Sequence, residues 1–454
     1  MPIEYDLVII GATELGGRMA RRAAQMGARV ALVEQSATPE QALKYRAVVR
    51  ASWPNLSDDD RTDDHENDRT KNRRNDHKDD RAAWLNLRVQ DDASELSVES
   101  LQIAGVDYIA TAGAFVQNPI HGFQVTDRVL RSSHYVSALY GDRMVPLGLG
   151  HRETLKPEDI VEQWSHQWVH LKGQRVAIVG EMPVGVELAM ALRSQGAEVL
   201  LVVPTPHILP RLERAFGDRI QMVLETAGVK VCVGQSYESQ PIRDRIAEYD
   251  TVVLATPLAK LSPERLGLRS LNRSVMKQNQ LQLVGHRDEL TENIAATAQV
   301  EVEKILKPWS RRNPRPNSGY LAGLGAAWID STIVPPKTKP LKPRKICCLE
   351  GMSWDGDNLW YRVTIGRRGT ILSCYFMGDQ AAEWSGLLSI AIAAKISLTD
   401  LASLSLPNPH QNALITQWLH EWEQQSRSPW HEFFLDWLGF VRRRSIVKPP
   451  PKIK

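Results

Sequence analysis

Residues 6–34 read DLVIIGATELGGRMARRAAQMGARVALVE, and they are the most informative part of the chain about its fold. The short apolar run Leu7–Ile10 ends at Gly11, as is typical of a strand buried on both faces. A helical pattern then covers Arg18–Met26, and a second strand is expected over Arg29–Val33. The stretch therefore predicts a βαβ unit with a glycine-rich turn after its first strand.

The turn has the spacing of a dinucleotide-binding fingerprint with one change. Gly11 and Gly16 take the first and third glycine positions, and Glu34 stands at the strand tip, where an acid binds ribose hydroxyls. The middle position, where the backbone comes closest to a pyrophosphate, is Thr13. Its Cβ and hydroxyl crowd the phosphates, so the pattern predicts the fold more firmly than the ligand.

The chain repeats this pattern further along. Residues 174–203 read QRVAIVGEMPVGVELAMALRSQGAEVLLVV, which predicts strand, helix and strand, with the helix over Pro183–Ser194. Gly180 and Gly185 keep the first and third glycine positions. Two such units in one chain indicate an architecture that binds two nucleotides.

The second fingerprint is altered at the same place. Met182 replaces the middle glycine, and its side chain would occupy the space of the pyrophosphate. The strand ends in Val203 and Pro204 instead of an acid, and no arginine stands there to receive a 2′-phosphate. Glu187 remains in the helix. We expect the Thr13 and Met182 side chains to point into the former phosphate positions.

Length, net charge and cysteine content limit the classes of protein to which this chain can belong. A chain of 454 residues holds about three domains, and a net charge of +3 does not call for nucleic acid. The four cysteines have no metal-ligand spacing, so we expect reduced structural thiols and no metal site. The first residues run directly into a strand without a signal peptide, and no apolar run reaches transmembrane length. These features predict a cytoplasmic protein.

Two segments of the sequence are not expected to belong to the predicted folded domains. Residues 57–81 carry both charge signs and no apolar side chain, which predicts a solvated insertion. Near the C-terminus, aromatic and aliphatic residues recur at helical spacing and are followed by Arg442, Arg443 and Arg444. This helix is expected to pack on the chain's own body, or residues 429–454 bind a membrane surface or a protein partner.

The sequence pattern changes at residue 313 and again at residue 346. Residues 313–345 are rich in proline and basic side chains, which predicts a linker. From Ile346 an antiparallel pattern follows, with a hairpin over Leu359–Ile365 and Thr370–Met377. Two helices, Ala381–Ala394 and Gln411–Gln424, complete a small α+β domain.

Two Rossmann-like units and this third domain resemble the flavin-dependent pyridine nucleotide-disulfide reductases, which include dihydrolipoyl dehydrogenase, glutathione reductase and mercuric reductase. In the third domain, residues 359–384 and 395–404 carry the resemblance. It implies an α/β chain with two FAD/NAD(P)-binding domains and a C-terminal α+β dimerisation domain, and therefore a homodimer. The implied parts are an FAD-type domain (residues 1–150 and 258–312), an NAD(P)-type domain (151–257), the linker (313–345), the dimerisation domain (346–425) and the tail (426–454).

The residues that carry out catalysis and bind the flavin in that family are not found at the matching positions of this sequence. The family places two redox cysteines shortly after the first strand-tip acid, and residues 35–53 contain none. The flavin-binding aspartate that should follow Gly285 is His286. The family's catalytic histidine and glutamate are replaced by Asn408 and Ala413, which can neither transfer a proton nor orient a base.

We therefore expect a degenerate member without catalytic residues that acts as a homodimeric binding or scaffold protein, either cytoplasmic or peripheral to a membrane. The alternative is a flavin-dependent NAD(P)H oxidoreductase that works without a redox disulfide and binds FAD with a shifted pyrophosphate. NAD(P) is not expected, because Met182 obstructs its site. The degenerate cofactor-binding candidates are Gly11, Gly16, Glu34, Gly180, Gly185, Glu187 and Gly285.

Overall fold

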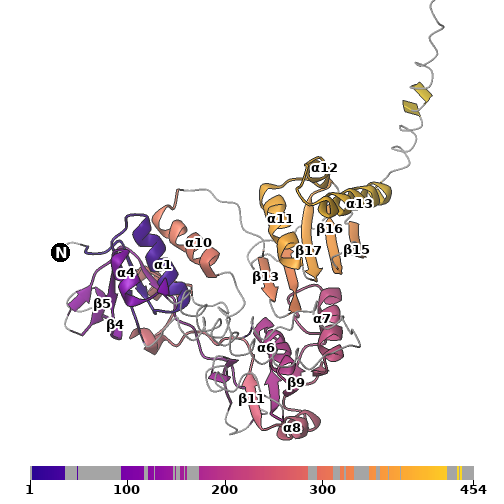
Figure 1. Ribbon diagram of the computed structural model, residues 1–454. Coiled ribbons are helices and arrows are strands. Elements are labelled where there is room, and N and C mark those ends of the chain that lie inside the picture. The colour runs from indigo at the N-terminus through magenta and orange to yellow at the C-terminus, as the bar shows by residue number, and fades with distance from the viewer. Residues whose placement is uncertain are drawn as a thin grey trace, which may run out of the picture. The chain divides into compact units, whose positions relative to one another are not determined.

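The chain forms two compact units in the computed structural model (Figure 1). The first comprises Met1–Arg312 with Gly319–Leu324, and the second comprises Asn313–Ser318 with Gly325–Lys454. The charged insertion at 57–81 and the pair Gly285 and His286 lie outside the described residues. The structure describes residues 3–35, 49, 94–116, 121–126, 128–146, 149, 154–157, 159–160, 173–284, 294–309, 317–321, 324–331, 347–353, 358–366, 368–378, 380–426, 437–438 and 440–441.

The first unit contains a five-stranded parallel sheet in the order β12-β7-β1-β2-β3. Its side chains alternate between two cores: Leu7 and Ile9 of β1 face one cluster, and Val8 and Ile10 face the other. This alternation explains the uninterrupted apolar sequence of β1. The strands are β1 (Leu7–Ile10), β2 (Val30–Val33), β3 (Val106–Ile109), β7 (Tyr135–Ser137) and β12 (Leu281–Leu283).

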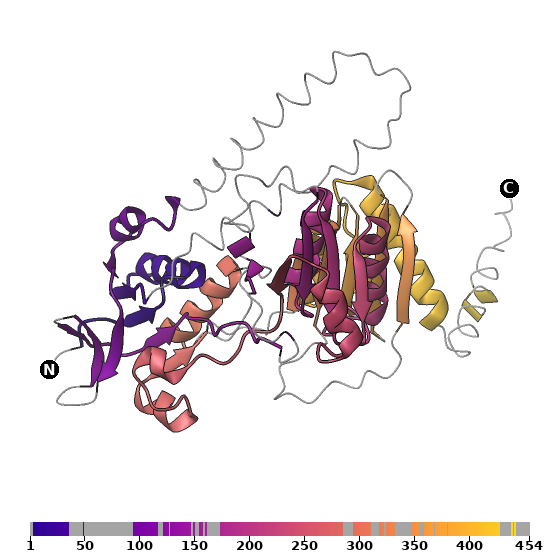
Figure 2. The same ribbon diagram turned by 90° about the horizontal axis from the view of Figure 1, so that it is seen from below.

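Helices cover one face of this sheet and a small antiparallel sheet covers the other. Helices α1 (Glu14–Gln25) and α10 (Ile294–Leu306) lie side by side (Figure 1, Figure 2) and share the first core. The second core includes side chains of β4 (Gly113–Val116), β5 (Gly122–Val125) and β6 (Arg128–Leu130). Three short elements complete this part: α4 (Val98–Ile103), η2 (Pro263–Leu266) and α9 (Arg273–Gln278).

A second parallel sheet of the same unit has the order β10-β9-β8-β11. The predicted helix Pro183–Ser194 is α6, with the same bounds. These two sheets confirm the α/β class with two Rossmann-like parts. The remaining elements are β8 (Arg175–Val179), β9 (Glu198–Val203), β10 (Lys230–Val233), β11 (Thr251–Leu254), α7 (Arg214–Thr226) and α8 (Gln240–Ala247).

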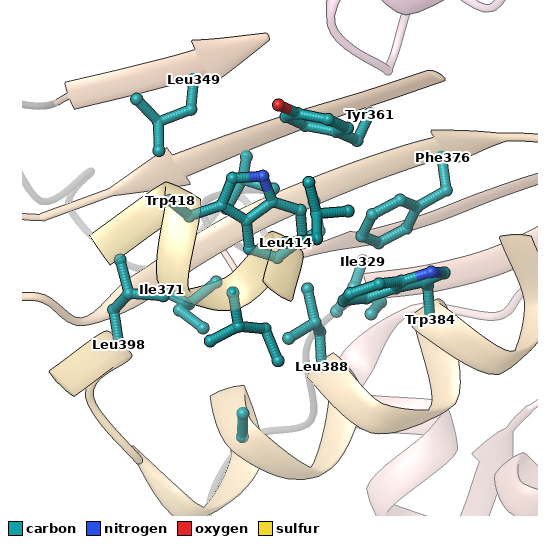
Figure 3. Packing of buried hydrophobic residues seen from close by; sticks show 14 of the residues in the cluster. Ile329, Leu349, Tyr361, Ile371, Phe376, Trp384, Leu388, Leu398, Leu414 and Trp418 are labelled. Carbon is teal, nitrogen blue, oxygen red and sulfur yellow. The ribbon is translucent and has the colours of Figure 1, made fainter. Parts of the chain in front are cut away.

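The second unit is built on an antiparallel sheet with the strand order β14-β17-β16-β15. The strand β13 extends this sheet next to β14. Its core is aromatic: Tyr361 and Phe376 from the sheet meet Trp384 and Trp418 from the helices (Figure 3), with the tryptophan ring centroids 5.2 Å apart. The elements are β13 (Asn317–Leu321), β14 (Ala326–Asp330), β15 (Cys347–Ser353), β16 (Leu359–Ile365), β17 (Ile371–Met377), α11 (Ala381–Ala394), α12 (Leu398–Ala402) and α13 (Pro409–Ser426).

One prediction needs correction. The stretch 313–345, expected to be a linker, contains β13 and β14, and every residue of β14 is buried. Its short apolar run AAWI was hidden by the proline-rich residues on both sides. In the first unit, β5 and β6 form a hairpin, because the chain reverses at Thr126, whose φ is +36°.

Candidate functional site

The glycine turn between β1 and α1 is closed by the chain's own packing. Gly11 has a φ of +105°, and a Cβ there would lie 2.8 Å from the Leu139 side chain. A Cβ on Gly16 would lie 2.0 Å from the carbonyl oxygen of Gly11. Both glycines are therefore required by the helix–strand contact itself, and their presence does not depend on a bound nucleotide.

Thr13, the residue at the middle glycine position, is the N-cap of α1. Its hydroxyl accepts a hydrogen bond from the amide of Gly16 at 3.2 Å and donates one to the carbonyl oxygen of Ala138 at 3.2 Å. The residue is 5% exposed. The side chain thus uses one of the helix-terminal amides that a pyrophosphate would contact in a dinucleotide fold.

The next residue, Glu14, was not singled out from the sequence, although it begins α1. Its side chain is fully buried and its Oε1 lies 2.8 Å from Nε of Arg18. A carboxylate in the first helical turn is stabilised by the positive end of the helix dipole. The sequence signal was an acid directly after the fingerprint's middle position, with an arginine four residues on.

Glu34, the expected ribose ligand, lies beside this turn. Its backbone carbonyl accepts a hydrogen bond from Ala12 at 3.1 Å, and its carboxylate accepts one from the Tyr108 hydroxyl at 3.3 Å. Burial, and then the adjacent negative charge of Glu34, raise the pKa of Tyr108 to about 12. The structure therefore brings Gly11, Gly16 and Glu34 together, with Tyr108 already bonded to the acid.

The second glycine turn is also closed by packing. Gly180 has a φ of +143°, and a Cβ there would lie 2.1 Å from the backbone of Ala255. A Cβ on Gly185 would lie 2.5 Å from that of Ala255. Glu187 lies within α6 and is 5% exposed.

Met182 is the N-cap of α6 and contributes no side-chain cap. Its amide donates to the carbonyl oxygen of Ala255 at 3.2 Å, and Pro183 opens the helix. The first turn of α6 contains no acidic residue. The obstruction of the pyrophosphate position by the methionine side chain stays a prediction, and the two turns differ in that only the first contains a buried carboxylate.

The positions that match the family's acid/base pair are structural in this chain. The Asn408 side chain accepts a hydrogen bond from the His410 amide at 3.0 Å, at the start of α13. Asn412 bonds both backbone groups of Leu406, at 3.2 and 2.9 Å, and Ala413 is exposed. The side chains of Asn408 and Asn412 therefore bond the backbone around the start of α13.

A cavity of about 380 Å³ lies along the outer side of α1 and not at its glycine turn. Its charges compensate one another, since Arg18 and Arg21 pair with Glu95 and Arg22 pairs with Glu303. The lining residues are Arg18, Arg21, Arg22, Gln25, Glu95, Leu96, Ala295, Ala298 and Gln299.

Metal binding and membrane insertion find no support in the part of the chain that the structure describes. No group of three or more histidine, cysteine or acidic side chains there is arranged to hold a metal ion. None of the helices among those residues combines the length and apolar character that a membrane crossing needs.

Curated proteins similar to this chain include two oxidoreductases. An NADH oxidase from Methanocaldococcus jannaschii is 25% identical over 280 residues, which are 51% of this chain and 60% of that protein. A glutathione reductase from a Nostoc species is 24% identical over 244 residues, which are 51% of this chain and 49% of that protein. The matched stretches thus span about half of this chain and less than two thirds of either relative.

Solved structures of similar fold include the HOCl-induced flavoprotein disulfide reductase RclA from Escherichia coli, with a TM-score of 0.62 and 16% identity. That comparison covers 91% of this chain and 99% of the other. The Cu(II) complex of RclA has a TM-score of 0.63 and 15% identity, and covers 90% and 98% of the two chains. These likenesses establish a shared fold.

The sequence pattern described as pyridine nucleotide-disulphide oxidoreductase matches residues 5–259, which include both glycine turns and both parallel sheets except β12. The match covers more than half of the chain. Together with the two Rossmann-like sheets, it leads to one conclusion: the chain belongs to the pyridine nucleotide-disulphide oxidoreductase family.

Proposed function

We propose that this family member is a non-catalytic, homodimeric binding or scaffold protein. The observation that carries the proposal is the structural use of Asn408 and Asn412, which bond the backbone around the start of α13 in place of an acid/base pair. Thiol–disulfide turnover also needs a reactive thiolate pair, and the first cysteine along the chain is Cys232. Without either part, the chain has no route for disulfide chemistry.

Family membership implies FAD in the first fold and a pyridine nucleotide in the second. The residues at the start of α1 do not fit the pyrophosphate of FAD. The Thr13 hydroxyl already accepts the hydrogen bond of the Gly16 amide, and Glu14 adds a buried negative charge. At the second turn, Met182 takes the place of the glycine that lets a pyrophosphate approach. We therefore assign no reaction step to either cofactor.

The proposed homodimer is supported by the character of α11. This helix is apolar on nearly all sides, yet Ile390 on its outer face is 66% exposed in the single chain. Gly386, on the same helix, has no atom near its Cβ position. A helix that is apolar all round is normally buried, so we assign its outer face to a second copy of the chain.

The C-terminal tail is proposed as the binding surface for a further partner, either a protein groove or an anionic membrane. Most of residues 429–454 lie outside the described residues, but Trp437 and Phe440 are 51% and 53% exposed. Removing every residue after Gln424 should abolish binding to vesicles of anionic phospholipid or to a captured protein partner. Binding that survives this truncation would place the partner surface elsewhere.

A flavin-dependent NAD(P)H oxidoreductase is the second candidate, and it is favoured by the similarity to an NADH oxidase. The absorbance spectrum of the purified protein separates the two functions. A non-catalytic protein is expected to be colourless, to retain no added FAD and to consume no NADH or NADPH. A yellow protein whose visible absorbance is bleached by either reduced nucleotide would establish the oxidoreductase instead.

A further inference from the structure

We infer that the chain supplies its own anion to the start of α1: the carboxylate of Glu14, together with the Thr13 hydroxyl, replaces the pyrophosphate of a dinucleotide. The inference rests on the proposed absence of bound FAD. It explains this absence by charge repulsion as well as by the steric obstruction from Thr13. It concerns the first fold only. Three observations carry it.

The first observation is the burial of Glu14. A fully buried carboxylate is costly unless it is paired and hydrogen-bonded. Here Nε of Arg18 lies 2.8 Å from Oε1, and the first helical turn adds the positive end of the helix dipole. The positive end of the helix dipole is also what favours a bound phosphate at a helix N-terminus.

The second observation is that the Thr13 hydroxyl makes two hydrogen bonds. It accepts from the Gly16 amide and donates to Ala138, and so bridges the helix to the residue after β7. The middle position of the fingerprint is the one at which a glycine lets the pyrophosphate approach the backbone. In this chain it is filled by a side chain that satisfies the helix end without a ligand.

The third observation is the contrast with α6, which has no acid in its first turn and no side-chain cap. Both folds have lost the middle glycine, but only α1 has an acid in its first turn, since the buried Glu187 lies further along α6. A pyrophosphate that approached α1 would meet the like charge of Glu14 in a site shielded from water, where charge repulsion is strong.

The double variant Thr13→Gly/Glu14→Ser tests the inference, with FAD as the probe. It opens the middle position and removes the carboxylate, and glycine is a well-tolerated replacement for an N-cap threonine. We expect the wild-type protein to retain no FAD after gel filtration. The double variant should bind FAD at least about tenfold more tightly in a fluorescence titration, equivalent to about 1.4 kcal/mol.

Glu95→Gln is the matched control, because Glu95 also pairs with Arg18, at 3.8 Å, but has a side chain that is 56% exposed. This variant should bind no more FAD than the wild type. Glu14→Gln keeps the side-chain volume and removes only the charge. It should show a smaller gain than the double variant, and it provides the test if the double variant does not fold.

Two results would overturn the inference. One is wild-type protein that binds FAD as tightly as the double variant. The other is a Glu14→Gln or double variant with a native circular dichroism spectrum and no gain in FAD affinity. In the second case, a colourless wild type without NADPH consumption would leave the proposed non-catalytic function standing, so the two failures can be told apart.

Discussion

The hydroxyl of Thr13 lies 3.2 Å from the amide nitrogen of Gly16 and accepts its hydrogen bond, so the residue that interrupts the fingerprint is also the cap of its helix. Thr13→Ala removes this bond and should lower the free energy of unfolding by about 1 kcal/mol. Thr13→Ser keeps the hydroxyl and should lose much less. Chemical denaturation monitored by circular dichroism provides the comparison, and equal losses for the two variants would contradict the capping role.

Gly185 is required by the contact between α6 and the end of β11. Gly185→Ala should destabilise the protein by about 1–3 kcal/mol, because the new Cβ would lie 2.5 Å from that of Ala255. Gly17→Ala is the matched control, since its Cβ would meet only the flexible Leu96 side chain at 3.3 Å. That variant should be neutral or stabilised through helix propensity. The difference in thermal unfolding midpoint between the two variants measures the effect, and a neutral Gly185→Ala would refute the packing explanation.

The hydrogen bond from Tyr108 to Glu34 predicts a dependence of stability on alkaline pH. Burial and the neighbouring carboxylate raise the pKa of Tyr108 from 10.0 to about 12 in the folded protein. A raised pKa means that the folded protein binds the phenol proton of Tyr108 more tightly than the unfolded chain does. The stabilisation of the fold by this proton is therefore complete below about pH 10 and is lost as the pH rises towards 12. Tyr108→Phe should therefore reduce the loss of stability over this range.

Absorbance of the phenolate anion checks this assignment directly. The difference between the titration curves of wild type and Tyr108→Phe should correspond to one phenol that ionises at a pKa of about 12. Tyr5→Phe is a useful comparison, because burial and Asp107 raise the pKa of Tyr5 to about 12 as well. A Tyr108 difference curve with the ordinary tyrosine pKa of about 10 would contradict the assignment.

The proposed dimer predicts a specific role for Ile390. Ile390→Arg places a charge on the outer face of α11 and should shift the protein from dimer to monomer in sedimentation velocity experiments, with the fold of each chain retained. Ile103→Arg is the control, because Ile103 is 88% exposed on α4 and has no place in the proposed interface. A wild-type protein that sediments as a monomer, or an unchanged dimer for Ile390→Arg, would remove α11 from the interface.

Local sequence patterns were sufficient for many of the regular elements of the fold. The apolar run of β1, the helix α6 between its two glycines and the strand β16 each depend on residues close in sequence, and each was expected from the sequence. The strand at 317–321 and its neighbour β14 were not expected, because a short buried strand between proline-rich stretches has little periodicity of its own.

Residue identity was enough to show that Thr13 and Met182 interrupt the two glycine fingerprints, and to predict that the thiol and acid/base groups of the family are absent. The roles of the residues that stand at these positions depend on the folded chain. The second partner of Thr13 is Ala138, 125 residues away, and Glu14 becomes a buried ion because the folded sheet and helices exclude water from it. Burial and long-range hydrogen bonds arise from contacts that no local pattern contains, and they give the residues of the altered turn their roles.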